Sequence, residues 1–243
     1  MRFMELAIRN LKEMCRDPLS MGLEIGIPAG FLVMFWALGR GIGESFFTPT
    51  MLVPGIAVFG FAFLVMFSAM VLARDKESAL LSRVFTAPLR SRDFILSYSL
   101  PYIPIVILQM AVCFGVGALL GLEILGNVGL VLLVLFVMGI CCVELGMIMG
   151  LLFTQNQVAG VGSVIITLVA LLGGIWIDLE AIGGVFYSLG NALPFAHALD
   201  AARDIMVHGV GFSDIATDFY WVLGYTVVFF ALGIFLFRRR MVE

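Results

Sequence analysis

The chain has 243 residues, of which 62% are apolar and 13% are charged, and its net charge is −3. A soluble domain usually contains roughly 25% charged residues, so this composition excludes an ordinary soluble enzyme and is typical of an integral membrane protein. The small negative charge also argues against nucleic acid as a partner.

The first segment, residues 1–18, is predicted to form an amphipathic helix that lies flat on the membrane surface. With a helical turn of about 100° per residue, its charged side chains fall in one sector and its apolar side chains lie opposite, with Asn10 as the exception. An ordinary short connector is the alternative. A cleavable signal peptide is not expected, because the first long apolar run comes later and is long enough to span a membrane.

Six apolar runs follow, and each approaches or exceeds the length of about 20 residues that a membrane-spanning helix needs. The expected spans are residues 19–39, 52–73, 95–121, 127–152, 158–177 and 219–237. The fold class is therefore all-α and integral to the membrane, with six transmembrane helices in a single domain, 1–243.

Six spans place both termini on one side of the membrane, and the basic residues indicate which side. Cytoplasmic loops are enriched in Lys and Arg. Twelve of the fourteen Lys and Arg residues lie in the N-terminal segment, in the loop between spans two and three, and in the C-terminal tail. We therefore expect a multi-pass protein of the cell (plasma or inner) membrane with both termini in the cytoplasm.

Two carboxylates lie inside predicted spans, Glu24 in the first and Glu144 in the fourth. A charge at mid-bilayer costs roughly 3 kcal/mol on insertion scales, and such residues usually face a protein interior or a watery path. Both are candidates for a substrate path or for gating. Alternatively, Glu24 reaches the inner surface and pairs with Arg16, and Glu144 makes a structural hydrogen bond.

The cytoplasmic loop 74–93 mixes charged and apolar residues. It begins with Arg74-Asp-Lys-Glu77 and continues with Leu80, Leu81 and Phe85. The charges alone fit anchoring to anionic lipid. A short amphipathic helix that docks into a groove on a soluble partner explains the charges and the apolar residues together.

The outer connection, residues 178–218, is too long for a tight turn and too apolar for a solvated loop. We interpret it as a re-entrant segment of one or two short helices that dip into the outer leaflet before the last span, where other protein or water must cover irregular backbone. Such a segment could act as an outer gate or plug.

Several chemistries are excluded by missing motifs. A phosphate-binding P-loop needs glycine before its lysine, and neither Lys12 nor Lys76 follows one. His197 and His208 have no companion ligand, so no metal site is expected. The chain is therefore not expected to be an enzyme, to contain catalytic residues or to bind a cofactor itself.

Four short motifs occur in order along most of the chain: Arg16-Asp-Pro18, Glu77 followed by Thr86-Ala-Pro-Leu-Arg90, Gln155-Asn-Gln157, and Leu193-Pro-Phe-Ala-His-Ala-Leu-Asp-Ala-Ala-Arg203. Together with the six spans, they resemble the permease subunits of type-2 ABC exporters, a family that exports drugs, antibiotics, lipids and polysaccharides. The chain departs from the family pattern at two positions. Asp178 stands where the family often has proline, and His197 replaces the common aromatic residue.

The resemblance implies a partner that supplies energy. An ATP-binding cassette ATPase subunit would bind ATP and Mg, a second permease subunit would complete a homodimer or heterodimer, and a coupling helix in loop 74–93 would transmit the ATPase's motion. The residues expected to carry ATPase coupling are Arg16, Glu77, Leu80, Leu81, Arg83 and Phe85. The residues expected to line or gate the substrate path are Glu24, Glu144, Asp178 and His197.

Two other functions remain open. A proton-coupled secondary transporter would use Glu24 or Glu144 as its proton site, although six spans without a visible internal repeat fit that class poorly. A membrane scaffold that transports nothing is the other alternative.

Overall fold

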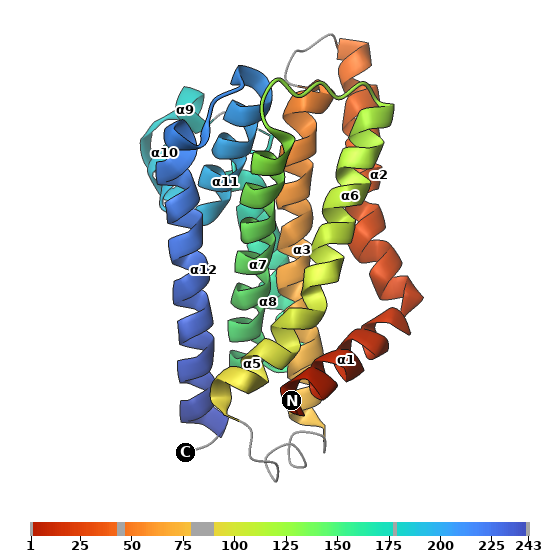
Figure 1. Cartoon of the computed structure of the whole chain (residues 1–243), viewed down its shortest axis with the longest axis vertical. Coiled ribbons are helices and arrows are strands. Elements are labelled where there is room, and N and C mark those ends of the chain that lie inside the picture. The colour runs from red at the N-terminus through yellow and green to blue at the C-terminus, as the bar shows by residue number, and fades with distance from the viewer. Residues whose placement is uncertain (1, 43–46, 79–89, 177–178, 242–243) are drawn as a thin grey trace.

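The structure, a computed structural model, describes residues 2–42, 47–78, 90–176 and 179–241 (Figure 1). Every regular element in these ranges is helical, which confirms the all-α prediction. The elements in chain order are α1 (Arg2–Cys15), α2 (Pro18–Ile42), α3 (Pro49–Glu77), α5 (Ser91–Ser99), the 3-10 turn η2 (Leu100–Tyr102), α6 (Ile103–Leu119), α7 (Val128–Leu152), α8 (Gln155–Leu172), α9 (Leu179–Ile182), α10 (Gly184–Asn191), α11 (Pro194–Arg203), the π-helical turn η3 (Asp204–His208) and α12 (Phe212–Met241).

Six helical stretches in the described ranges are long and apolar enough to cross a membrane, which confirms the predicted number of spans. They are Pro18–Gly41, Pro49–Glu77, Ser91–Leu119, Val128–Leu152, Gln155–Leu172 and Phe212–Arg239. The fifth span ends at residue 172 instead of 177. The reason is a pair of glycines: Gly173 caps the helix, and Gly174 has a φ of 69°, a conformation that continues no right-handed helix.

The third span is built from two helices. α5 and α6 are joined by the 3-10 turn η2, which contains Pro101, and Pro104 follows in the first turn of α6. Proline has no N–H to donate and restricts the residue before it, so it favours a change of direction at this point. α5 runs obliquely across one end of the bundle, whereas α6 runs along the bundle (Figure 1).

α3 is the centre of the bundle and is buried along most of its length. α7 approaches it closely at two glycines. A Cβ atom at Gly146 would lie 2.6 Å from the Val65 carbonyl, and one at Gly150 would lie 2.8 Å from the Ala69 carbonyl. Small residues at this spacing let two helix backbones meet.

The two ends of the bundle carry different elements (Figure 1). The proximal end, as we name it, holds both termini, α1, α5 and the end of α3, whereas the distal end holds α9, α10 and α11. Both termini thus lie at one end, as six spans require. The side of the membrane on which they lie stays a prediction.

α1 is an amphipathic helix, as predicted, and it turns away from the axis of α2 (Figure 1). Ala7 and Asn10 are buried against the bundle, while Met4 and Ile8 are about half exposed. The one polar residue that broke the apolar pattern therefore has a structural role, because the Asn10 amide donates a 3.2 Å hydrogen bond to the Ser97 carbonyl of α5. The position of α1 in the membrane interface stays a prediction.

The predicted outer segment consists of three short helices, α9 to α11, and the turn η3, instead of one or two helices. α11 is largely buried and packs against α12, α7 and α3. α10 instead exposes Val185, Phe186 and Leu189. A buried helix beside an apolar exposed one is compatible with a segment that enters the membrane, and this re-entrant position stays a prediction.

Candidate functional site

Four consecutive charged residues end α3, and each contacts a different part of the proximal end. We call the residues that meet there the proximal charge cluster: Arg9, Glu13, Arg74, Asp75, Lys76, Glu77 and Tyr98. Arg74 Nη2 lies 2.6 Å from Glu13 Oε1 of α1, and Glu13 also pairs with Arg9 at 2.6 Å. α1 is thereby held against the end of α3.

Asp75 is the buried charged residue of the cluster, with 4% of its surface exposed. Its Oδ2 accepts a 2.8 Å hydrogen bond from the Tyr98 hydroxyl of α5 and lies 3.3 Å from Arg9 Nη1. Charge-assisted hydrogen bonds of this kind are stronger than neutral ones and are needed to keep a buried carboxylate charged. Asp75 therefore fixes α5 to α3, the two helices that flank residues 79–89.

Lys76 and Glu77 bind the connection between α7 and α8. Lys76 Nζ donates to three carbonyls at the end of α7, those of Gly150 at 2.9 Å, Leu151 at 3.2 Å and Phe153 at 2.6 Å. Such a cation is favourable at a helix C-terminus. Glu77 Oε1 accepts a 3.0 Å hydrogen bond from the backbone N–H of Gln155, where α8 begins and a carboxylate is favourable.

The predicted ATPase-coupling residues fall into two groups. Glu77 and Arg16 are exposed at the proximal end. The remaining four lie outside the described residues: Leu80, Leu81, Arg83 and Phe85. Glu77 is thus a member of the cluster from which loop 79–89 emerges, and its coupling role stays a prediction.

Sequence reasoning missed the partners of these residues on α1 and α5. Arg9 and Asp75 are separated by 66 positions, so nothing local in the sequence joins them. One signal was present: Asn10 is a polar residue on the apolar side of α1, and such a residue usually satisfies a hydrogen bond to protein.

Glu24 and Glu144 are both buried, with 3% of each residue exposed, but they lie in different parts of the bundle. Glu24 of α2 lines a pocket at the proximal end between α1, α2 and α3. Its Oε1 has no hydrogen-bond partner among the described residues, and neither has Oε2 of Glu144 in α7. No ion pair in the described part of the chain joins Glu24 to Arg16, so the predicted alternative in which Glu24 pairs with Arg16 is not observed.

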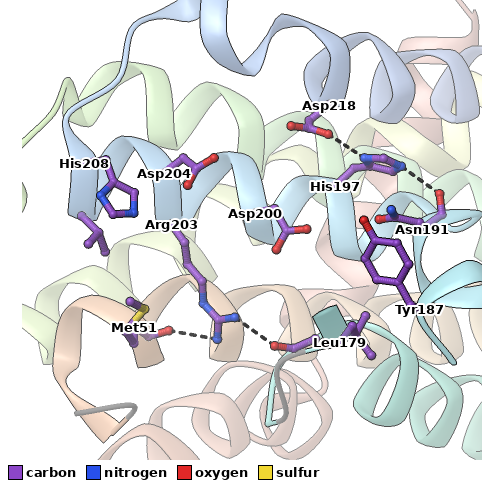
Figure 2. A pocket seen from close by; sticks show the side chains of 12 residues that line it. Met51, Leu179, Tyr187, Asn191, His197, Asp200, Arg203, Asp204, His208 and Asp218 are labelled. Carbon is purple, nitrogen blue, oxygen red and sulfur yellow. Dashed lines mark hydrogen bonds and ion pairs between the residues drawn. The ribbon is translucent and has the colours of Figure 1, made fainter. Parts of the chain in front are cut away.

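A second pocket, of about 580 Å³, lies at the distal end between α10, α11, η3 and α12 (Figure 2). His197 of α11 bridges two of these elements. Its Nδ1 lies 2.6 Å from Asp218 Oδ1 of α12, and its Nε2 lies 2.9 Å from the Asn191 carbonyl of α10. Because both partners are acceptors, the doubly protonated imidazolium satisfies them best. The hydrogen bond to Asp218 is the main cause that raises the pKa of His197 above its ordinary value.

Arg203, at the end of α11, holds the distal segment to the spans. Its guanidinium donates to the carbonyls of Gly174 at 2.9 Å, Ile175 at 3.3 Å and Met51 at 3.5 Å, and Figure 2 shows it directed toward Met51. It thereby joins α11 to the end of α8 and the start of α3. Arg203 ended the outer motif in the sequence, which was the signal for this contact.

Asp200 faces the same pocket one turn before Arg203. Loss of water around the carboxyl raises its pKa to about 6, and the neighbouring Asp218 and Asp204 add to this while Arg203 opposes it. No group of three or more His, Cys, Asp or Glu residues in the described ranges could hold a metal ion. Asp178 lies outside the described residues.

Comparison with known proteins places the chain among transporters. The family described as "ABC-2 type transporter" matches residues 1–207. A curated relative, ABC transporter G family member 20 of Dictyostelium discoideum, is 25% identical over 201 residues, which is 78% of this chain. The chain spans about 27% of the length of that relative.

Proposed function

Since the chain belongs to the ABC-2 type transporter family, we propose that it is the membrane subunit of an ABC exporter. In this proposal, ATP and Mg bind to a separate ATPase subunit, and the chain moves a drug-like, lipid or glycan-like substrate outward. The proximal end then faces the cytoplasm of a cell bounded by the plasma or inner membrane, in agreement with the basic residues at that end.

The observation that carries the proposal is the proximal charge cluster. It lies at the end of α3, directly before residues 79–89 in the chain, and it connects this end to α1, α5, α7 and α8. A force applied to the loop would therefore move α3 and α5 together with their neighbours. This is the property that a coupling segment needs, because closure of the ATPase pair must displace spans and not only a surface loop.

We further propose that two such permeases form the substrate path between them. α2, α8 and α12 bury few residues within the chain, and α8 exposes Val164, Leu168 and Leu171. Gly22 and Gly26 of α2 also face open space, since a Cβ atom at either position would meet no atom within 4 Å. Lipid covers such faces in a monomer, and a second permease covers part of them in a dimer.

The test is ATP turnover by the full-length chain purified from its native membranes with its partners. We expect an ATPase with a P-loop to copurify and Glu77→Lys to abolish the turnover that the chain stimulates, because the substitution puts a cation at the positive end of α8. The matched control is Asp214→Lys. Asp214 also accepts a backbone N–H at a helix start, from Gly211 at 3.0 Å, but it lies at the start of α12, away from the loop.

Unchanged turnover in Glu77→Lys would remove the coupling assignment, and equal loss in both variants would show that the effect is structural. The buried carboxylates Glu24 and Glu144 favour one rival, a proton-coupled carrier. Transport that continues without ATP and stops when the proton gradient collapses would establish that rival. A scaffold that transports nothing would copurify with no ATPase.

A further inference from the structure

The pocket that contains Glu24 has a shape suited to one end of a longer molecule. Its volume is about 260 Å³, below the roughly 300–1,000 Å³ of sites that hold a whole drug-sized ligand. α1, α2 and α3 form most of its wall, with Tyr102 of η2 and Gln155 of α8 completing it. A head group fits this volume, whereas a complete lipid does not.

Glu24 gives the pocket an unsatisfied acceptor. Only 3% of the surface of Glu24 is exposed, and its Oε1 has no hydrogen-bond partner among the described residues. Its own backbone carbonyl lacks the usual helical donor as well, because residue 28, four positions later, is proline and has no N–H. A buried carboxylate without a partner is costly, so this position favours a ligand that donates hydrogen bonds or carries positive charge.

The charges around the pocket also favour a ligand with positive charge. Three carboxylates line it, Glu13, Asp17 and Glu24, against one guanidinium, that of Arg74. Glu13 is already paired with Arg74. Asp17 accepts hydrogen bonds from the hydroxyl and the backbone N–H of Ser20, which lower its pKa. Glu24 is therefore the carboxylate left for a ligand, in a site where negative groups outnumber positive ones.

The rest of the lining is apolar or aromatic. Two methionines come from α1 and α2, and α3 contributes Phe67, Met70 and Val71. Methionine side chains adapt to flexible chains, and aromatic rings attract cations at close range. The pocket thus combines an anionic acceptor with walls that suit methylene groups, and it lies beside α1, whose exposed Met4 and Ile8 suit contact with lipid.

We propose that this pocket binds the ammonium head group of an amphiphile from the adjacent leaflet, with Glu24 as its anionic partner. The ammonium group can come from an aminophospholipid or from a free long-chain amine. Binding needs neither ATP nor a partner subunit, so the inference goes beyond the proposed transport function and can fail or succeed independently of it.

The experiment uses the full chain in an uncharged maltoside detergent, with four probes in two pairs. Retention of phosphatidylethanolamine and of phosphatidylglycerol with the same acyl chains is measured by native mass spectrometry, and displacement is tested with dodecylammonium against dodecanol. The wild type is expected to retain phosphatidylethanolamine at least tenfold more tightly than phosphatidylglycerol, or to bind dodecylammonium at least tenfold more tightly than dodecanol.

Two isosteric variants locate the site. Glu24→Gln is expected to lose this preference, whereas Glu144→Gln, which alters an equally buried carboxyl outside the pocket, is expected to keep it. Retention of phosphatidylethanolamine alone identifies a phospholipid as the occupant, and binding of dodecylammonium alone identifies a free amphiphile. A wild type that does not distinguish ammonium probes from their controls, or a Glu24→Gln variant that binds like the wild type, would overturn the proposal. The wild-type comparison holds even if a variant fails to fold.

Discussion

The hydrogen bond between Tyr98 and Asp75 offers a quantitative test of the proximal charge cluster. Tyr98→Phe removes one hydroxyl from a fully buried ring and leaves the Asp75 carboxylate with Arg9 at 3.3 Å. A hydrogen bond to a charged group contributes about 1.5–3 kcal/mol, which corresponds to a roughly 10- to 150-fold change in the unfolding equilibrium. We expect a loss of this size in the free energy of unfolding.

Tyr225→Phe is the matched control for this substitution. The Tyr225 hydroxyl donates to the Ala192 carbonyl at 2.6 Å, so the same group is removed, but the bond is exposed, neutral and at the distal end. Net contributions of neutral hydrogen bonds are about 0.5–1.5 kcal/mol. Denaturant unfolding of the purified full chain measures both variants under the same conditions.

A double-mutant cycle with Asp75→Asn then isolates the pair. Groups in direct contact show coupling energies of about 0.5–3 kcal/mol, whereas independent sites are additive. We expect Tyr98→Phe to cost at least about 1 kcal/mol less in the Asp75→Asn background than in the wild type. Additivity of the two substitutions, or a Tyr98→Phe variant as stable as Tyr225→Phe, would refute the assignment of this bond.

Three further outcomes are expected. Lys76→Met should speed amide hydrogen exchange in the last turn of α7, because the three carbonyls there lose their donor; unchanged exchange would contradict these contacts. Gly150→Ala should destabilise the chain by about 1–3 kcal/mol, since its methyl group meets the α3 backbone. Gly26→Ala, which meets open space in the interior of α2, should leave stability unchanged or raise it by up to about 1 kcal/mol; equal losses in both variants would contradict the packing. His197→Gln should lower the melting temperature more at pH 6 than at pH 9. The raised pKa of His197 stabilises the fold below its ordinary value of 6.5, and this stabilisation is lost as the pH rises through the raised pKa. The same pH profile in Asp218→Asn would assign the effect to the pair, and a loss of stability independent of pH would contradict it.

The number and order of the spans could be predicted because lipid allows few solutions. An apolar run in a bilayer must satisfy its backbone groups internally, which makes hydropathy a direct guide to helices. The ends of helices depend on single backbone positions. The fifth span continued to residue 177 by hydropathy, but Gly174 adopts a positive φ and the helix stops at Leu172.

The contacts between the ends of helices could not be predicted, because they join residues far apart in the chain. The sequence identified Glu77 and Arg203 as members of motifs. It could not indicate that Glu77 accepts the N–H of Gln155, 78 positions away, or that Arg203 donates to Met51, 152 positions away. Nor could it distinguish the buried Asp75 from the more exposed charged residues beside it, since burial of a charge depends on a partner that compensates for its lost hydration.

The two ends of the bundle are connected through α3, and its construction decides how a displacement would travel. Pro54 has no N–H for the preceding turn, but residues 55–77 continue without a proline for roughly 34 Å. Most of this stretch is buried, and α7 touches its backbone at Gly146 and Gly150, so bending it would open gaps in a close-packed interior. A displacement of the proximal charge cluster should therefore tilt α3 as a rigid rod. The movement would be taken up at Pro54 and Gly55, beside the Arg203 guanidinium that holds the distal segment, which is where the distal pocket would change shape.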